Sequence, residues 1–326
     1  MTHIAKKVGF VCVTLLVLVP ASPGLVAAAQ EKRTDSTPSR PATPPQPKPP
    51  EPGPSATSGD DATASSPAGE ALPEFAPDEF ILLPIRVHLL RSEQIPEIDA
   101  CNLTETDIDR ILGKVNGVWR QAGVRWVLQS IVCEPAADEE RFALSKSLGS
   151  QALGQYLTLR PELTRDPALH HVYFIHEFQV NGVYLGNNIA FVKETARLRP
   201  VEGGIDEPIP RVLSHELGHS LGLPHRQHGT NLMASGTTGT LFNAAEIQRS
   251  REVAMRASSA ATAEQLARRA RVHFDAGRWC DALAIDAELI ALPGESKLKR
   301  ESVVRYFAAL RFGVGSDLKP QPSSGR

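Results

Sequence analysis

The chain has 326 residues and a nearly balanced charge, with 35 Lys and Arg against 37 Asp and Glu. Twelve of its 26 prolines fall in residues 31–77. That segment has too few aliphatic side chains to offset the entropy of ordering it, so a globular fold of the whole chain is excluded. No basic run is present and aromatic residues make up 6%, which argues against a nucleic-acid-binding protein.

The N-terminus has the order of a secretory signal. Two lysines precede the apolar run Val8–Val19, and Ala27–Ala29 offers an A-x-A cleavage site. We therefore expect a signal peptide over 1–29 and an exported protein that is secreted, periplasmic or held at the cell surface. An uncleaved membrane anchor is the alternative, although the run is short for a span of about 20 residues. After cleavage we expect no membrane span.

Residues 30–77 are predicted to form a Pro-rich disordered linker, extended in the manner of polyproline II. Export would permit disulfides. Three cysteines remain after signal cleavage, Cys101, Cys133 and Cys280, so at least one has no partner within the chain. Cys101 and Cys133 are the favoured pair, and three buried free thiols are the alternative.

Residues 78–258 contain alternating strand and helix patterns, which predict an α+β domain. The expected strands are 81–90, 124–132, 171–178 and 187–192, and the expected helices are 104–122, 150–159, 208–221 and 243–257. Thr104 with Asp107, and Asn243 with Glu246, resemble helix-capping pairs.

Residues 259–326 are helical in pattern with no strand signal, which predicts a small all-helical unit. The segment 270–294 resembles a single tetratricopeptide repeat. The alternative is a helical hairpin that packs on the preceding domain.

The segment HELGHSLGLPH, residues 215–225, carries the strongest chemical signal. His215 and His219 are four residues apart on a helix, so both imidazoles can reach one metal ion. Gly222 is predicted to end the helix, and the turn lets His225 supply a third ligand. Three protein ligands leave a position for water, as in catalytic zinc sites. Glu216 would lie beside the metal, where it suits a general base.

These residues fit the pattern H-E-x-x-H-x-x-G-x-x-H and resemble the metzincin-type zinc metalloproteases. Met233 lies eight residues after His225, an offset like that of the matrixins. The resemblance is strong over 208–235 and extends over 80–257 only as a compatible element order. It implies a twisted mixed β-sheet with an active-site helix and a C-terminal helix. It also implies an endopeptidase whose substrate lies antiparallel along an edge strand above that helix.

The resemblance assigns one catalytic Zn²⁺ to His215, His219 and His225, the general base to Glu216 and the Met-turn floor to Met233. The substrate would be a protein or peptide, and residues 182–192 would include the edge strand. No cysteine lies between Gln30 and Ala100, so the cysteine latch of matrixin propeptides is not evident.

Two further sets of residues have weaker signals. His228 and Tyr184 are candidates for a second oxyanion donor, although His228 is better explained as a loop residue. A second metal could be held by His170, His171, His176 and Glu177, but HVYFIHEF reads more readily as a buried strand with polar ends.

Two functional alternatives stay open. One is a catalytically silent peptide-binding module on the same scaffold, which would have no need of Glu216. The other is a zinc hydrolase of a non-protein amide, because the pattern specifies the metal and the base but not the acyl group.

Overall fold

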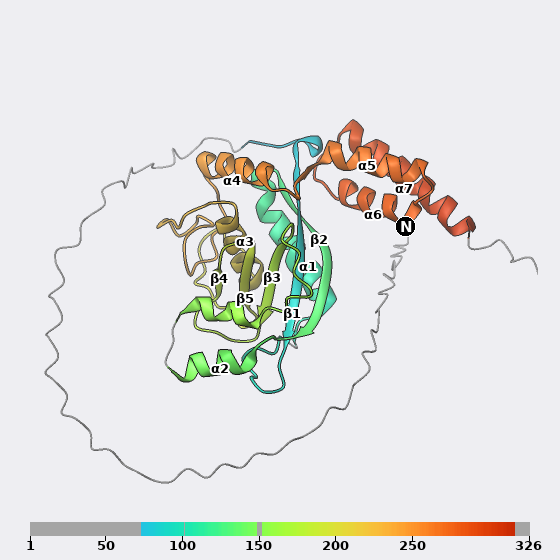
Figure 1. Ribbon diagram of the computed structural model, residues 1–326. Coiled ribbons are helices and arrows are strands. Elements are labelled where there is room, and N and C mark those ends of the chain that lie inside the picture. Colours follow the sequence, from blue (N-terminus) through green and yellow to red (C-terminus); the bar gives the residue numbers. More distant parts are fainter. Residues whose placement is uncertain (1–72, 101, 149–151, 317–326) are drawn as a thin grey trace, which may run out of the picture. The chain divides into compact units, whose positions relative to one another are not determined.

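The computed structural model describes residues 73–100, 102–148 and 152–316 (Figure 1). The predicted signal peptide, almost all of the predicted linker and Cys101 lie outside these residues. Within the described part of the chain, no helix combines the length and the apolar character that a bilayer span requires.

A mostly parallel sheet forms the centre of the domain, and its strand order is β2-β1-β3-β5-β4. The strands are β1 (Ile81–Arg91), β2 (Val124–Pro135), β3 (His170–Ile175), β4 (Gly182–Tyr184), β5 (Ile189–Lys193) and the two-residue β6 (Ala261–Thr262). β1 pairs in parallel with β2 and β3, and β3 pairs in parallel with β5. β4 runs antiparallel to β5, and β6 runs antiparallel to the start of β1. The sheet is therefore mixed but mostly parallel, and together with the helices it is consistent with the predicted α+β class.

Among the described residues, seven α-helices accompany the sheet (Figure 1). They are α1 (Glu105–Trp119), α2 (Glu139–Ser147), α3 (Pro208–Ser220), α4 (Ala244–Arg256), α5 (Ala263–Asp275), α6 (Trp279–Ile290) and α7 (Lys297–Ser316), with 3₁₀ turns at Pro77–Glu79, Arg120–Ala122 and Leu153–Leu159. Of the helix expected over 150–159, the described part Leu153–Leu159 forms a 3₁₀ turn, and α2 was not predicted.

Alternation along the strands separates two cores. Leu83, Ile85 and Val87 of β1 face the core that contains α1 and α3. Tyr173 and Phe191 point the other way, into the core that contains α2 and the 153–159 turn. Helix α3, which carries the predicted site, is therefore buried against one face of the sheet.

Local sequence signals set where the helices begin. Asp107 N–H donates to the Thr104 hydroxyl at 3.2 Å, and the Asp107 carboxylate accepts from Thr104 N–H, so the predicted capping pair of α1 is confirmed. Asn243 and Glu246 form the same reciprocal pair at α4. Helix α3 begins instead at Pro208, whose fixed φ suits a first turn.

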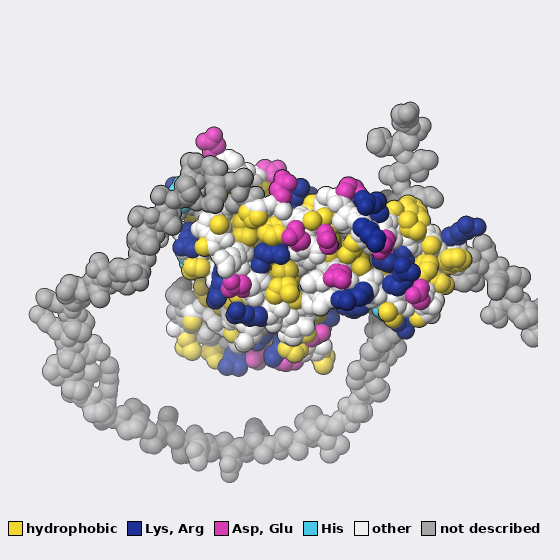
Figure 2. Space-filling view, turned by 90° about the horizontal axis from the view of Figure 1, so that it is seen from above, with side chains coloured by type: hydrophobic (Ala, Val, Ile, Leu, Met, Phe, Trp, Pro, Cys, Tyr) yellow, Lys and Arg dark blue, Asp and Glu magenta, His cyan; other side chains and the backbone are white. Residues whose placement is uncertain are grey.

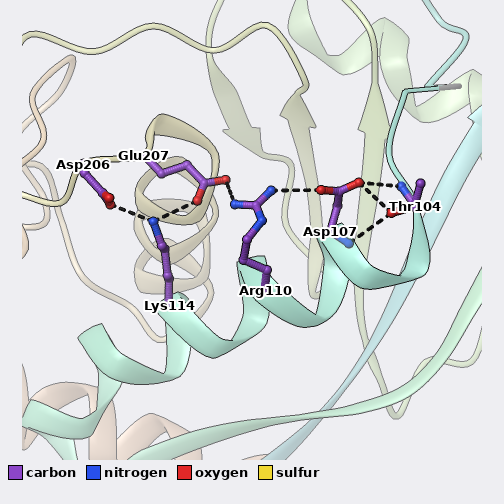
Figure 3. A network of polar contacts seen from close by, with 6 residues as sticks. All are labelled: Thr104, Asp107, Arg110, Lys114, Asp206 and Glu207. Atoms are coloured by element: carbon purple, nitrogen blue, oxygen red, sulfur yellow. Dashed lines mark hydrogen bonds and ion pairs between the residues drawn. The ribbon is translucent and has the colours of Figure 1, made fainter. Parts of the chain in front are cut away.

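Ion pairs connect the start of α3 to α1 (Figure 3). Lys114 Nζ lies 2.7 Å from Asp206 and 3.0 Å from Glu207, the residue that precedes α3. Arg110 bridges Glu207 and Asp107. The network joins two helices of the same core on their solvent side.

The C-terminal helices pack on the domain through a third apolar cluster. It joins Phe80 and Leu82 to Ala263, Leu289 and Leu292. This arrangement matches the hairpin alternative more closely than an isolated repeat, although a third helix, α7, completes the unit. The prediction of no strand in this region was wrong, because β6 adds to β1.

A buried ion pair holds the helical unit together. Arg305 of α7 donates to Asp286 of α6, with Nε to Oδ2 at 2.8 Å, and the Asp286 side chain is fully buried. On the face drawn in Figure 2, basic and acidic side chains are interspersed with apolar ones.

The thiols differ from both sequence-based alternatives. Cys133 and Cys280 are free and exposed, so neither is a buried thiol and Cys133 is not in a disulfide. The Cys133 sulfur instead accepts a hydrogen bond from Arg91 Nε at 3.0 Å.

Candidate metal centre

Helix α3 and the turn after it bring three imidazoles to one point. His215 and His219 are one helical turn apart, and Gly222 reverses the chain with φ 78°, a conformation that glycine adopts without strain. The Nε2 atom of His219 lies 3.2 Å from that of His215 and 3.1 Å from that of His225. The three residues form the one group of potential metal ligands found among the described residues.

These separations fit a zinc ion. Nitrogen ligands at 2.0–2.1 Å in tetrahedral geometry lie about 3.3 Å from one another, close to the spacing of the Nε2 atoms. The three imidazole nitrogens could therefore hold one metal ion together. The donor set therefore fits a zinc centre with a further coordination position.

The hydrogen bonds of the Nδ1 atoms determine the tautomers of His215 and His219. His215 Nδ1 lies 2.8 Å from the Leu232 carbonyl, and His219 Nδ1 lies 2.9 Å from the Leu223 carbonyl. A carbonyl only accepts, so each Nδ1 carries the hydrogen and each Nε2 lone pair of the neutral ring faces the centre.

Burial also keeps these rings neutral. It lowers the pKa of His215 to about 3, against the opposing hydrogen bond to Leu232, and it lowers the pKa of His219. A neutral imidazole is the form that binds a metal.

Glu216 follows His215 on α3 and is buried against strand β4. Burial raises its pKa to about 8, while a hydrogen bond from the backbone of Tyr184 and the charge of Arg211 act in the opposite direction. A Cβ atom at Gly182 would lie 2.8 Å from Glu216 Oε1, so only glycine lets the strand approach the carboxylate so closely. A bound cation would stabilise the ionised form and lower the pKa again.

Met233 is fully buried beneath helix α3. A Cβ atom at Gly218 would lie 2.5 Å from the Met233 sulfur, so the thioether packs directly on the helix backbone between the two helical histidines. The Met233 N–H donates to Asn231 Oδ1 at 2.7 Å, and its carbonyl accepts from Arg226 N–H at 2.9 Å. The predicted Met-turn residue thus lies next to the predicted metal ligands.

Glu246 of α4 holds this loop from outside, a role that its capping signal did not reveal. Its carboxylate accepts from Arg226 Nε and from Asn231 Nδ2, each at 2.8 Å. Arg226 follows His225 in the chain, and Asn231 supports Met233. One buried carboxylate therefore supports the chain on both sides of the loop.

Arg211 is a second residue that the sequence reasoning missed. It lies one turn before His215 on α3, and its guanidinium donates to carbonyls of residues 232–239. A lone arginine in the run PRVLSH carries no periodic or motif signal of such a role.

The candidate oxyanion donors have other partners. The Tyr184 hydroxyl accepts a hydrogen bond from Asn188 N–H at 3.4 Å within its own hairpin, and only the backbone of Tyr184 contacts Glu216. The exposed His228 has its Nδ1 2.9 Å from the Thr230 hydroxyl. Neither of these two hydrogen bonds involves His215, His219 or His225.

The four residues considered for a second metal do not come together, and the buried-strand interpretation holds for His170 and His171. His171 contacts His88, and His170 packs edge-on against Trp126. His176 and Glu177 follow the strand and pair separately, with Glu194 and Lys193.

Comparisons with known proteins add no relatives. A scan against protein-family models found no match, and a search of curated proteins found none of significant similarity.

Proposed function

We propose that the chain is an exported, zinc-dependent metalloendopeptidase of the metzincin type. The observation that carries the proposal is the convergence of three Nε2 atoms at zinc-like spacing, with a buried carboxylate, Glu216, next to His215 on the same helix. Met233, which packs against the helix between His215 and His219, adds support. Its position eight residues after His225 is a feature of the resemblance that the HExxH motif alone does not include.

The edge strand suggests how a peptide would bind. β4 pairs only with β5 within the described sheet, so no strand covers its other edge, although its Tyr184 N–H donates to Glu216. An extended peptide can add to such an edge by main-chain hydrogen bonds, with side chains entering pockets alternately. Because the β4 backbone also touches Glu216, a peptide bound there would place its backbone close to the carboxylate.

The reaction proposed is hydrolysis of a peptide bond. When bound, zinc would supply the Lewis acidity that activates water and polarises the scissile carbonyl. Glu216 Oε accepts the proton that the attacking water loses and delivers it to the amine nitrogen of the leaving peptide. The Tyr184 N–H donates to the carboxylate, and Gly182 lets β4 approach it closely.

Digestion of a proteome-derived peptide library, read by mass spectrometry, tests the proposal. The zinc-loaded protein should generate new peptide termini with a defined preference on the carboxyl side of the cut, and a chelator should abolish them. Full zinc occupancy without any peptide cleavage would instead favour a hydrolase of non-protein amides or a peptide-binding module.

A further inference from the structure

Arg211 is a buried cation on the helix that carries the metal ligands. Its side chain is 2% exposed. Nε donates to the Gly239 carbonyl at 3.1 Å, and Nη2 donates to the carbonyls of Leu232, at 2.7 Å, and Ala234. All three acceptors belong to the loop that contains Met233.

No carboxylate within ion-pair distance of this guanidinium occurs among the described residues. Burial lowers the pKa of Arg211 to about 10, with the charge of Glu216 opposing, so the side chain stays charged at neutral pH. Removing a charge from water is costly unless hydrogen bonds compensate. Here neutral carbonyls provide those hydrogen bonds. An apolar side chain could fill the same core position without the cost of burying a charge.

One of these carbonyls connects Arg211 to the metal centre. The Leu232 oxygen accepts from Arg211 Nη2 and also from His215 Nδ1, at 2.7 and 2.8 Å. The orientation of the His215 ring therefore depends on where the guanidinium holds that carbonyl. Leu232 and Ala234 also flank Met233. The two hydrogen bonds from Arg211 Nη2 to their carbonyls therefore help to position the Met233 thioether against the helix.

We propose that Arg211 is a positioning residue for the metal, acting through the Leu232 carbonyl on His215 and through the backbone on Met233. The inference rests on the proposed metal binding. The planar guanidinium fork of arginine can donate to several loop carbonyls in one fixed arrangement. The ammonium group of a lysine, on a flexible side chain, cannot reproduce that arrangement.

Two effects of Arg211 oppose each other, and they can be separated. Its hydrogen bonds orient a ligand and strengthen metal binding, whereas its charge repels a cation and weakens it. Arg211→Lys keeps the charge and loses the fork, while Arg211→Met loses both. If the fork dominates, both variants bind zinc more weakly; if only the charge matters, the Lys variant matches the wild type and the Met variant binds more tightly.

The experiment is zinc affinity by chelator competition on the full chain, together with the visible absorption spectrum of the Co²⁺-substituted protein. We expect both variants to bind zinc about 10- to 100-fold more weakly, as for other partners of ligating histidines. The Co²⁺ bands should shift, which a loss of general stability would not cause. Arg305→Lys is the matched control, because that arginine is also buried but belongs to the C-terminal helices.

Wild-type affinity and an unchanged Co²⁺ spectrum in Arg211→Lys would overturn the inference, as would an equal loss of affinity in Arg305→Lys. If neither Arg211 variant folds, NMR of the wild-type protein decides. Zinc should then slow hydrogen exchange at Arg211 Nε, and an unchanged rate would overturn the inference. A wild-type protein that binds no zinc would contradict the proposed function itself.

Discussion

Two clusters of histidines lie on opposite sides of the same sheet, and they differ in what their ring nitrogens face. In the first, His215, His219 and His225 turn their Nε2 atoms toward one another, with carbonyls behind two of the rings. In the second, His88 and His171 lie on β1 and β3, where side-chain alternation points them away from α3.

In the second cluster every ring nitrogen has a protein partner. His88 Nδ1 lies 2.5 Å from Glu134 Oε1, and its Nε2 lies 2.8 Å from His171 Nδ1. His171 Nε2 lies 2.7 Å from the Asp166 carbonyl. No lone pair is left to converge on a cation. The comparison shows that the direction of the lone pairs, rather than the number of buried histidines, distinguishes a metal centre from a buried polar network.

The largest effect is expected when one histidine of the first cluster is replaced. His219→Asn should abolish stoichiometric zinc binding and bring peptidase activity below detection, because two imidazoles cannot replace three. Metal analysis of the purified protein measures this. The matched substitution His171→Asn should leave one zinc per chain, and its loss there would break the distinction between the clusters.

Removing the carboxylate of the second cluster should act on stability instead. Glu134→Ala leaves the fully buried His88 without its Nδ1 partner, which we expect to cost about 3 kcal/mol of unfolding free energy. Urea denaturation measures the loss. Zinc stoichiometry should be unchanged, and a loss of zinc from a folded variant would contradict the separation.

A third buried histidine makes stability depend on pH. Burial lowers the pKa of His170 to about 4, from 6.5 in an unfolded chain. As the pH falls below 6.5 the unfolded state binds the proton first, so stability is lost down to about pH 4 and this group adds no further loss below that. The total is about 3 kcal/mol.

The metal-free His170→Gln protein should lose less stability than the metal-free wild type over that pH range. Parallel curves of unfolding free energy against pH for the two proteins would exclude His170 as the source.

A smaller effect is expected where Met233 meets the helix. Gly218→Ala would place a methyl group 2.5 Å from the Met233 sulfur and should cost about 1–3 kcal/mol through overpacking. Thermal unfolding measures it. Gly113→Ala on α1 is the control, because its added methyl group meets nothing within 4 Å and should be neutral or stabilising. Equal shifts for both would mean that Met233 is not packed as described.

The sequence could predict what depends on local spacing. The helix expected over 208–221 is present at Pro208–Ser220 and carries His215, Glu216 and His219, while Met233 is buried. The four long strands also follow from apolar patterning.

The residues that support the site could not be predicted in the same way. Arg211 acts on carbonyls more than 20 residues away, and Glu246 acts on Arg226 and Asn231. Such contacts arise when distant segments fold together, and neither the helical period nor a fixed motif encodes them. Helix α2 was missed because its sequence EERFALSKS has one buried residue, Phe142, and therefore no apolar stripe.

The most direct test of the central claim compares the wild type with Glu216→Gln at equal zinc occupancy. Gln keeps the shape of the side chain but cannot accept the proton from water. We predict that Glu216→Gln binds zinc and cleaves a peptide from the library hits on the order of 10²–10⁴ times more slowly than the wild type. Equal cleavage rates at equal zinc content would contradict it.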